Sequence, residues 1–583
     1  CRISDIISVE EYAMRVTLSK SKNAEQVYIT KAFRNEKGKS TSKIFTKLGT
    51  MAELLPQHDN DREKVIAWAK EQARILTEQE KNNTLKIPVQ LSEGVQLKLG
   101  EQVSFNGGYL FLQKIFHELG MDKICSEIRS RHSFEYDLSD VLSGLLYSRI
   151  LSPSSKLSSY EYLKGLIEAP TYDLHDVYRA LDVLNSEADN IQASLYAANR
   201  SSHNTSVLYY DCTNFFFEIE EEDDFRKYGK SKEHRPNPIV QMGMFIDGDG
   251  IPLAFTVFPG NENEQPTLIP LEEKIIKDYE LSKFIVCTDA GLASEVNRRF
   301  NDKADRSFIV RQSLKQIKKH LREWALDPQG WRLGSDGKLY DLSKIDEEQY
   351  MDCVFHKERW IKENGFEQRM IVSFSPKYKH YQRNIRQRQV ERAAKIVQNG
   401  KKSKTRNPNS PTRFVDEIQT TMDGEVAEII NRSLNEKKIQ EEEMYDGFTA
   451  VCTTLEDDIK DILKVNQRRW EIEESFRIMK SEFKARPVYL RKEGRIKAHF
   501  LTCFLSLLIY RTLEKKLGEK YTTEEIIRTL RSMDFYRIDE TGYAPIYTRT
   551  EITDSLHEVM GFRTDSEIIL DGTMKKIIRK TKR

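Results

Sequence analysis

"SVLYYDCTNFFFEI", residues 206–219, is the stretch from which the fold can be worked out. It is a run of β-branched and aromatic residues, which favours a buried strand. The next apolar stretch, "QMGMFIDGDGIPLAFTVFPG" at 241–260, predicts a hairpin, because the turn signal Asp247–Gly250 separates two apolar halves. Patterns for a helix, a strand, a helix and a strand follow at 265–280, 283–291, 292–302 and 307–314. This order predicts an α/β fold, a mixed sheet flanked by helices.

Two regions precede this core. Residues 1–95 are expected to be β-rich, since residues 25–49 alternate apolar and polar side chains around the turn signal Asn35–Gly38. Positive charges dominate that hairpin over Glu36: Lys31, Arg34, Lys37, Lys39, Lys43 and Lys47. They form either a solvated face or an arm that contacts DNA phosphates. Residues 96–203 have helical periodicity, which fits either a module that binds DNA ends or a plain helical bundle.

Three regions follow the first part of the core, which we place at 204–314. Residues 315–445 are expected to form an inserted domain with a basic helix and a polar loop. Residues 446–520 return to the core with a strand, further helices and the apolar run "FLTCFLSLLIY", which is too short to span a bilayer and predicts a buried core helix. Residues 521–583 are expected to be helical and to end in the basic tail "KKIIRKTKR".

The inserted region has a strongly unbalanced charge. Between 377 and 406 the only acidic residue is Glu391, against Lys377, Lys379, Arg383, Arg386, Arg388, Arg392, Lys395, Lys401, Lys402, Lys404 and Arg406. The whole chain is nearly neutral, with a formal net charge of +1, so affinity for a polyanion requires local clustering of this kind. The run therefore favours contact with a polyanion, and a solvated face is the alternative.

The cysteines indicate a reduced compartment. None of the seven lies in a Cys-x-x-Cys pair, and no secretory leader is present in the sequence given, so we expect an intracellular protein without a zinc module. We also expect no association with a membrane.

Two aspartates and one helix carry the candidate chemistry. Asp211 and Asp289 are each expected to close a hydrophobic strand, a rigid position from which to direct a carboxylate. Taken alone, each is also a good turn former or helix cap. In "RRWEIEESFRIMKSEF", residues 468–483, Arg469, Glu473 and Lys480 lie within an arc of about 40° beside an apolar stripe. The alternative for this helix is a simple Arg469–Glu473 ion pair.

Three converging carboxylates suit one chemistry well. Asp211, Asp289 and Glu473 would hold two divalent metal ions, which activate an attacking oxygen and stabilise the leaving oxygen of a phosphodiester. Mg²⁺ prefers such oxygen ligands, and Mn²⁺ is expected to substitute for it. Arg469 would bind a phosphate through two donors, and Lys480 would supply a point charge.

These motifs resemble those of DDE-type transposases of bacterial insertion sequences, in the group marked by a tyrosine–arginine–glutamate–lysine signature. Arg469, Glu473 and Lys480 match the signature in identity and spacing, whereas Asn466 occupies the tyrosine position. "YYDCTNFFFE" and "VCTDAGLAS" resemble the two aspartate motifs, and residues 228–264 resemble the segment between them. The similarity covers most of the chain.

The resemblance implies a ribonuclease-H-like core with an insertion before the glutamate helix, and a DNA transposase that works by cut and paste. It implies a homodimer that pairs terminal inverted repeats, cuts double-stranded DNA and joins it to target DNA, in the bacterial cytoplasm at the nucleoid. Three more residues are candidates for DNA contact: Trp470, which stacks on a base or packs in the core, and His234 and Arg235, which line the DNA channel or form a loop salt bridge.

Two other functions remain open at this point. One is a ribonuclease-H-like DNA nuclease or resolvase, which would cut DNA without joining it. The other is a catalytically inactive, transposase-derived DNA-binding protein, to which only Asn466 points.

Overall fold

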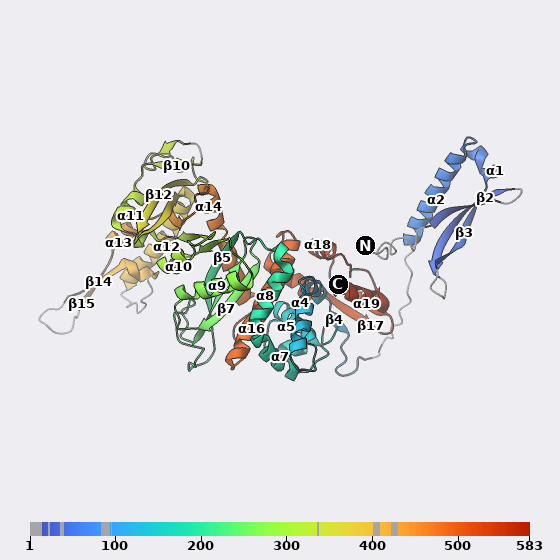
Figure 1. The fold of residues 1–583 in the computed structure, drawn as a ribbon, viewed down its shortest axis with the longest axis horizontal. Helices are drawn as coiled ribbons and strands as arrows, with labels where there is room; N and C mark the ends of the chain where they lie inside the picture. The colour runs from blue at the N-terminus through green and yellow to red at the C-terminus, as the bar shows by residue number, and fades with distance from the viewer. Residues whose placement is uncertain are drawn as a thin grey trace. The chain divides into compact units, whose positions relative to one another are not determined.

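The computed structural model describes residues 14–20, 24–34, 40–82, 94, 96–334, 337–399, 409–420 and 429–583. The chain divides into two compact units, Cys1–Leu97 and Lys98–Arg583 (Figure 1). Each unit has its own hydrophobic core.

The first unit is a three-stranded antiparallel sheet packed against a long helix. Its elements are β1 (Met14–Lys20), β2 (Glu25–Arg34), β3 (Ser40–Thr50), α1 (Met51–Leu54), η1 (Leu55–His58) and α2 (Arg62–Asn82). The predicted hairpin is confirmed by the pairing of β2 with β3, and its turn, with Glu36, Lys37 and Lys39, lies outside the described residues. Helix α2 was not predicted. It buries Val65 and Ala69 against Val27 of β2.

One sheet of ten strands organises the second unit, in the order β11-β10-β12-β13-β16-β9-β8-β5-β6-β7. The strands of this sheet that come first in the sequence are β5 (Val207–Phe216), β6 (Ile239–Ile246), β7 (Pro252–Pro259), β8 (Ile285–Thr288) and β9 (Ser307–Arg311). Strands β5, β6 and β7 form an antiparallel meander, whereas β8 pairs in parallel with both β5 and β9. The predicted mixed sheet and the hairpin about Asp247–Gly250 are thus confirmed.

Residues 315–445 extend that same sheet. Their elements, with one shared at the boundary, are η5 (Leu314–Gln316), α11 (Lys319–Leu326), β10 (Trp331–Leu333), β11 (Leu339–Tyr340), β12 (Phe355–Glu363), β13 (Phe366–Phe374), α12 (Pro376–Asn399), η6 (Pro411–Phe414), β14 (Val415–Thr420), β15 (Ile429–Leu434) and α13 (Glu436–Glu443). Strand β13 pairs with β16 (Phe448–Thr453), which itself pairs with β9. Of the basic run, Lys401, Lys402, Lys404 and Arg406 lie outside the described residues.

Helices cover both faces of the sheet. They are α9 (Leu268–Asp278), α10 (Glu295–Phe300), α14 (Ile459–Gln467), α15 (Trp470–Ser481) and α16 (Glu493–Lys516). Alternate side chains of β5 point to opposite faces. Leu208 and Tyr210 belong to the core that includes α9, whereas Tyr209 belongs to the core that includes α15 and α16.

A helical layer surrounds α16. It consists of α3 (Tyr109–Glu118), α4 (Met121–Arg131), α5 (Leu138–Leu151), α6 (Lys156–Leu163), α7 (Leu174–Ser186), α8 (Ala188–Asn199) and η2 (Arg200–Ser202). Among the described residues, α16 is the one helix long and apolar enough to cross a membrane, although its apolar run alone is shorter. Because 89% of its most apolar window is buried, α16 is better explained as a core helix.

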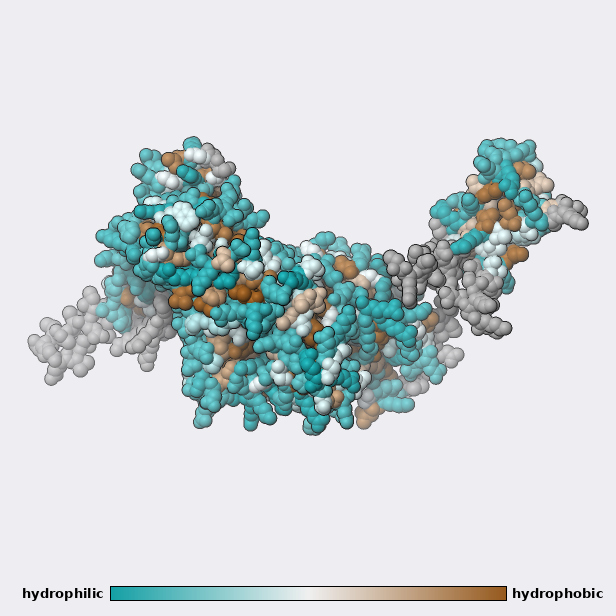
Figure 2. Space-filling model, viewed as in Figure 1, coloured by the Kyte–Doolittle hydropathy of each residue, from teal (hydrophilic) through white to brown (hydrophobic). Residues whose placement is uncertain are grey.

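The C-terminal region is not purely helical, contrary to prediction. It contains α17 (Thr523–Ser532), β17 (Asp534–Ile538), β18 (Gly542–Pro545), α18 (Glu551–Met560), β19 (Ile569–Leu570) and α19 (Asp571–Thr581). Strand β17 pairs with the distant β4 (Ser104–Asn106), so these short strands left no local signal. The predicted basic tail is helix α19, which buries Met574 and Ile577. The surface seen in Figure 2 is mostly hydrophilic, with apolar side chains in small patches.

Candidate active site

Asp211 on β5 and Asp289 directly after β8 lie side by side. In the parallel pair of β5 and β8, Tyr210 is opposite Thr288, so the two aspartates occupy the next position on each strand. The preceding odd-numbered residues, Tyr209 and Cys287, are buried in the core that includes α15. The two-residue period of a strand therefore directs Asp211 toward α15, and Asp289 follows in the same register.

The strand-end prediction was wrong for Asp211. Strand β5 continues to Phe216, because beyond β8 it still pairs with β6, where Asp211 is opposite Met244. Asp289 does follow the last residue of β8, and it occupies the N-cap position of η4 (Ala290–Leu292). Its side chain makes no capping hydrogen bond there, so the cap alternative does not account for its carboxylate.

Helix α15 brings Glu473 to the same place. The apolar stripe of Ile472, Phe476 and Met479 is buried as predicted, so the row of charged residues lies along its edge. An Arg469 nitrogen lies 3.0 Å from Oε1 of Glu473, and its other terminal nitrogen lies 3.8 Å from Oδ1 of Asp289. The ion pair that we considered as the alternative therefore exists, and the same guanidinium also connects the helix to the second aspartate.

A cavity of about 440 Å³ joins these acids to a group of cations. Its lining includes Asp211, Glu473, Lys232, Lys480 and Arg486. Burial raises the pKa of Asp211 to about 6, although the charges of Lys232 and Arg469 pull it down. Burial likewise lowers the pKa of Lys480 to about 8. The site thus contains ionisable groups of both signs, partly removed from water.

Two aromatic rings of β5 support the cations. Lys480 Nζ lies 5.4 Å from the ring centre of Phe215, and the guanidinium of Arg486 lies 5.0 Å from that of Phe216. Arg235 lies 4.4 Å from the same Phe216 ring, and among the described residues it does not form the loop salt bridge that we considered. Cation–π attraction holds a positive charge near an apolar wall. The wall therefore holds three cations, of which Lys480 and Arg486 line the cavity with the acids.

Sequence reasoning missed Lys232, Glu233 and Arg486. Lys232 donates to the carbonyl oxygen of Cys212, next to Asp211, and Glu233 forms ion pairs with both Lys480 and Arg486. Lys232 and Glu233 stand in an irregular loop and Arg486 follows α15, so periodicity offered no signal. The acid–base run "KSKEHR" was the only local indication.

The remaining predicted contact residues are at the surface of this region. Trp470 is 58% exposed, so the core-packing alternative was wrong. His234 lines a neighbouring cavity of about 1070 Å³ together with Lys230 and Lys232. Within the described residues, Oδ1 of Asn466 is buried and has no hydrogen-bond partner.

The hairpin of β6 and β7 fixes the start of α15. Arg468 lies 2.9 Å from Glu471 and 3.9 Å from Asp249 of the hairpin turn. Arg511 of α16 donates to the backbone oxygen of Glu471 over 3.1 Å. These contacts orient the helix, which carries Glu473 into the site.

The donor atoms fit hard divalent cations, since all three acids offer carboxylate oxygen. The carboxylate oxygens of Asp211, Asp289 and Glu473 are not all within 4.8 Å of one another. Among the described residues, one group of potential metal ligands, elsewhere in the chain, meets that spacing. The Arg469 guanidinium lies between two of these acids, Asp289 and Glu473. Ions shared by all three acids would require Arg469 to move aside.

Residues 206–509 match a protein family described as the transposase DDE domain. The matched segment holds both aspartates, Arg469, Glu473 and Lys480. It spans more than half of the chain. The chain belongs to this DDE-domain family. Membership in this family supports the assignment of the protein as a DNA transposase.

Transposase complexes are among the solved structures similar to this DDE-domain chain. A piggyBac transposase synaptic complex with hairpin DNA has 9% identity, 80% coverage of this chain, 87% coverage of that chain and a TM-score of 0.35. A Mos1 transposase paired-end complex with the left transposon end has 11% identity, coverages of 40% and 65%, and a TM-score of 0.13. Similarities at these TM-scores add nothing to the family match. No match was found among curated proteins.

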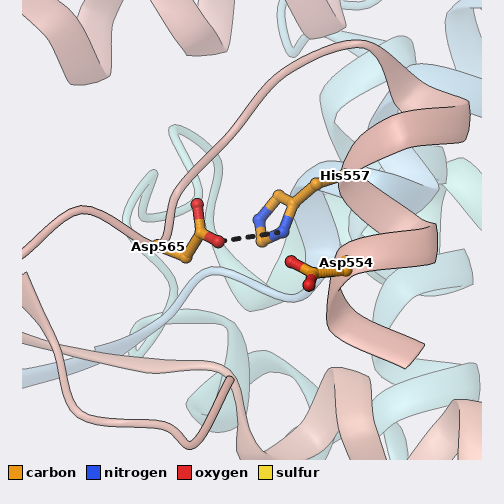
Figure 3. A group of neighbouring side chains, drawn as sticks. All are labelled: Asp554, His557 and Asp565. Atoms are coloured by element: carbon orange, nitrogen blue, oxygen red, sulfur yellow. Dashed lines mark ion pairs between the residues drawn. The ribbon is translucent and has the colours of Figure 1, made fainter. Parts of the chain in front are cut away.

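A second acidic cluster of this DDE-domain chain comprises Asp554, His557 and Asp565 (Figure 3). The backbone N–H of Thr564 donates to Nε2 of His557 over 3.1 Å, so neutral His557 carries its proton on Nδ1, the atom facing Asp565. Both aspartates are also paired with Arg563. An ion-pair cluster therefore explains this group better than a metal site.

Proposed function

We propose that the protein is the DNA transposase of a bacterial insertion sequence, in the group with the tyrosine–arginine–glutamate–lysine signature. It binds terminal inverted repeats, cuts the DNA and transfers the cut strands to a target. One observation carries this proposal: Arg469 lies between Asp289 and Glu473, while Asp211 and Glu473 line the same cavity. Family membership and the spacing of Arg469, Glu473 and Lys480 support it.

The proposed core is ribonuclease-H-like. The support is the strand order β7-β6-β5-β8-β9, an antiparallel meander followed by parallel strands, with one acid on β5 and the other directly after β8. Residues 315–445 are the insertion between β9 and the glutamate helix, and its parts outside the main sheet include α12 and the ribbon of β14 and β15.

In this proposal Asp211, Asp289 and Glu473 hold two Mg²⁺ ions. The ions supply Lewis-acid activation of the attacking oxygen and stabilise the charge on the leaving oxygen. Arg469, Lys480 and Arg486 bind and orient the phosphate groups, because Arg469 pairs with two of the acids and the other two cations line the cavity with Asp211 and Glu473. Trp470, His234 and Arg235 contact the DNA beside the cavity, supported by the exposure of Trp470 and the place of His234 in the neighbouring cavity.

The proposed partner is double-stranded DNA, both the transposon ends and the target. A homodimer pairs the two ends, which gives each active site one end to process. The setting is the bacterial cytoplasm at the nucleoid, in line with the absence of paired cysteine motifs.

Substitution of Glu473 tests the proposed function. Glu473→Gln is expected to lower metal-dependent nicking of end DNA by at least ~10³-fold with unchanged DNA affinity, since it removes one charged ligand and little volume. Glu474→Gln is the matched control, because Glu474 lies on the same helix and pairs with Arg477 instead. Nicking and binding are measured on labelled duplexes with Mg²⁺ or Mn²⁺.

Normal nicking by Glu473→Gln would refute the active site. A wild-type protein that nicks end DNA but never yields a joined product would instead be a nuclease. Strand transfer is therefore assayed in the same reactions, with a target plasmid present.

A further inference from the structure

Helix α12 carries an exposed row of basic and apolar side chains along one face. With about 100° per residue, Tyr381, Ile385, Arg388, Arg392 and Lys395 fall within an arc of about 80°. All five side chains are exposed, and Tyr381 reaches 60%. We call these five residues the α12 stripe.

The neighbouring face of α12 anchors the helix to the rest of the protein. Arg386 is buried and donates to Oδ1 of Asp446 over 2.6 Å. Gln382 accepts from the backbone N–H of Gly447 over 2.7 Å, and Ala393 is fully buried. A buried charge pair strongly opposes separation of its partners. The helix is therefore fixed with the stripe facing outward.

The charge of the stripe is uncompensated within the part of the chain that the structure describes. No ion pair is formed there by Arg388, Arg392 or Lys395, whereas Lys377 and Lys379 at the start of α12 pair with Asp352 and Glu347. Glu391 is the only acidic residue of the helix. A helix face that is merely solvated is not expected to concentrate positive charge in this way in a nearly neutral protein.

We propose that the α12 stripe is a docking surface for the sugar–phosphate backbone of double-stranded DNA, outside the catalytic cavity. The proposal rests on the proposed function, since a transposase must hold DNA well beyond the bond it cuts. From Tyr381 to Lys395 the stripe extends about 21 Å along the helix axis, which corresponds to about six base pairs of duplex. Its three cations are placed for phosphates, and Tyr381 and Ile385 for the apolar sugar edges.

Contacts to the backbone carry little sequence information, so the stripe should add affinity to any duplex. Each phosphate that a lysine or arginine neutralises adds about 0.9 to the slope of log K against log salt concentration. Loss of three such contacts should therefore lower the slope by roughly 2–3 and weaken binding at low salt by at least ~10-fold.

The test is DNA binding by the full chain in EDTA, measured by fluorescence anisotropy between low and moderate NaCl. The stripe variant is Arg388→Gln/Arg392→Gln/Lys395→Gln. The matched control, Lys319→Gln/Lys437→Gln/Lys438→Gln, removes the same charge from exposed positions on α11 and α13. The stripe variant should lose slope and affinity on two duplexes of unrelated sequence, while the control changes the slope by less than ~1. A charge-preserving Arg388→Lys/Arg392→Lys variant should keep the slope.

Equal losses in the stripe and control variants, or a wild-type slope in the stripe variant, would overturn the docking surface. A loss confined to one of the two duplexes would overturn the assignment to the backbone. Failure of the proposed function looks different, because the wild-type protein would then bind no duplex or fail to nick end DNA. Wild-type binding and nicking together with unaltered binding by the stripe variant would overturn the stripe alone.

Discussion

At the scale of single residues, the acids of the site are paired with cations in a partly buried cavity. Arg469 contacts both Asp289 and Glu473, and Lys232 lies beside Asp211. Three carboxylates without these cations would repel one another and take up protons. The cations therefore offset the repulsion between the acids, and the same cations are positioned to bind phosphate. Two predictions belong to this scale.

Glu233 forms ion pairs with the cations that would otherwise bind a phosphate. It pairs with Arg486 and lies 3.5 Å from Lys480, both of which line the cavity with Glu473. Glu233→Gln is expected to tighten DNA binding by roughly two- to tenfold at low salt, because the neutral side chain competes less with phosphate. Glu262→Gln removes the same charge from an exposed loop position nearby and serves as the control. Weaker binding by Glu233→Gln in a titration would show that Glu233 has a structural role instead.

Glu272 is expected to make folding stability depend on pH. Its side chain is fully buried, accepts one hydrogen bond from Asn301 and lies 3.9 Å from Arg306. Burial raises the pKa of Glu272 to about 7 from an ordinary value near 4.5, so the folded protein holds the proton more tightly than the unfolded chain. Stability due to Glu272 is thus greatest below about pH 4.5 and falls until about pH 7.

Glu272→Gln should remove this loss. Chemical denaturation at pH 8 should show the variant more stable than wild type by on the order of 3 kcal/mol, with the difference shrinking toward pH 5. A difference that stays constant with pH would mean that Glu272 titrates normally.

At the scale of elements, the position of α15 depends on its neighbours. The helix buries Ile472 and Met479 against the core, and contacts at Glu471 connect its first turn to the β6–β7 hairpin and to α16. The spacing of Arg469, Glu473 and Lys480 sets their common face, but these outside contacts set where that face points. Within this arrangement, the turn of the β6–β7 hairpin is packed most tightly against the start of α15.

Gly250 is expected to resist substitution for that reason. Its φ is +81°, and a Cβ there would lie 2.1 Å from Oε2 of Glu471. Gly250→Ala should cost about 1–3 kcal/mol in thermal unfolding and reduce nicking, because it adds backbone strain and displaces Glu471. Gly330→Ala, also at positive φ but with open space around it, reports the backbone cost alone, about 1 kcal/mol. Equal costs at both positions would exclude the contact with Glu471.

At the scale of the whole molecule, the two units have separate hydrophobic cores, which come from separate parts of the chain. The core of the first unit includes Val27, Met51 and Val65, and those of the second unit begin at Tyr109. The second unit also depends on distant pairings such as β4 with β17, which connect its beginning to its end. Independent cores predict independent unfolding.

Residues 98–583 are therefore expected to fold without the first unit. Calorimetry of the full chain should show two transitions, and the fragment should keep the one with the larger enthalpy at an unchanged midpoint. A fragment that melts earlier, or that exposes apolar surface to a dye, would contradict separate cores.

Much of the fold followed from local patterns. The aromatic strand at 206–219, the hairpin at Asp247–Gly250 and the helix of Glu473 were predictable, because their periodicity reflects the geometry of a single element. Helix α2 and strands β17 and β18 were missed. The strands are short, and their pairing partners lie far away in the chain or were themselves unpredicted.

For the site, the sequence by itself determined which residue types are present and which of them share a helix face. Only the tertiary structure decided that Asp211 lies within a strand beside Asp289, that Glu233 reaches Lys480, and that Trp470 is exposed. The physical reason is the range of the forces involved. Periodicity and turn chemistry act between near neighbours, whereas strand pairing, burial and ion pairs are settled by contacts between segments far apart in the chain.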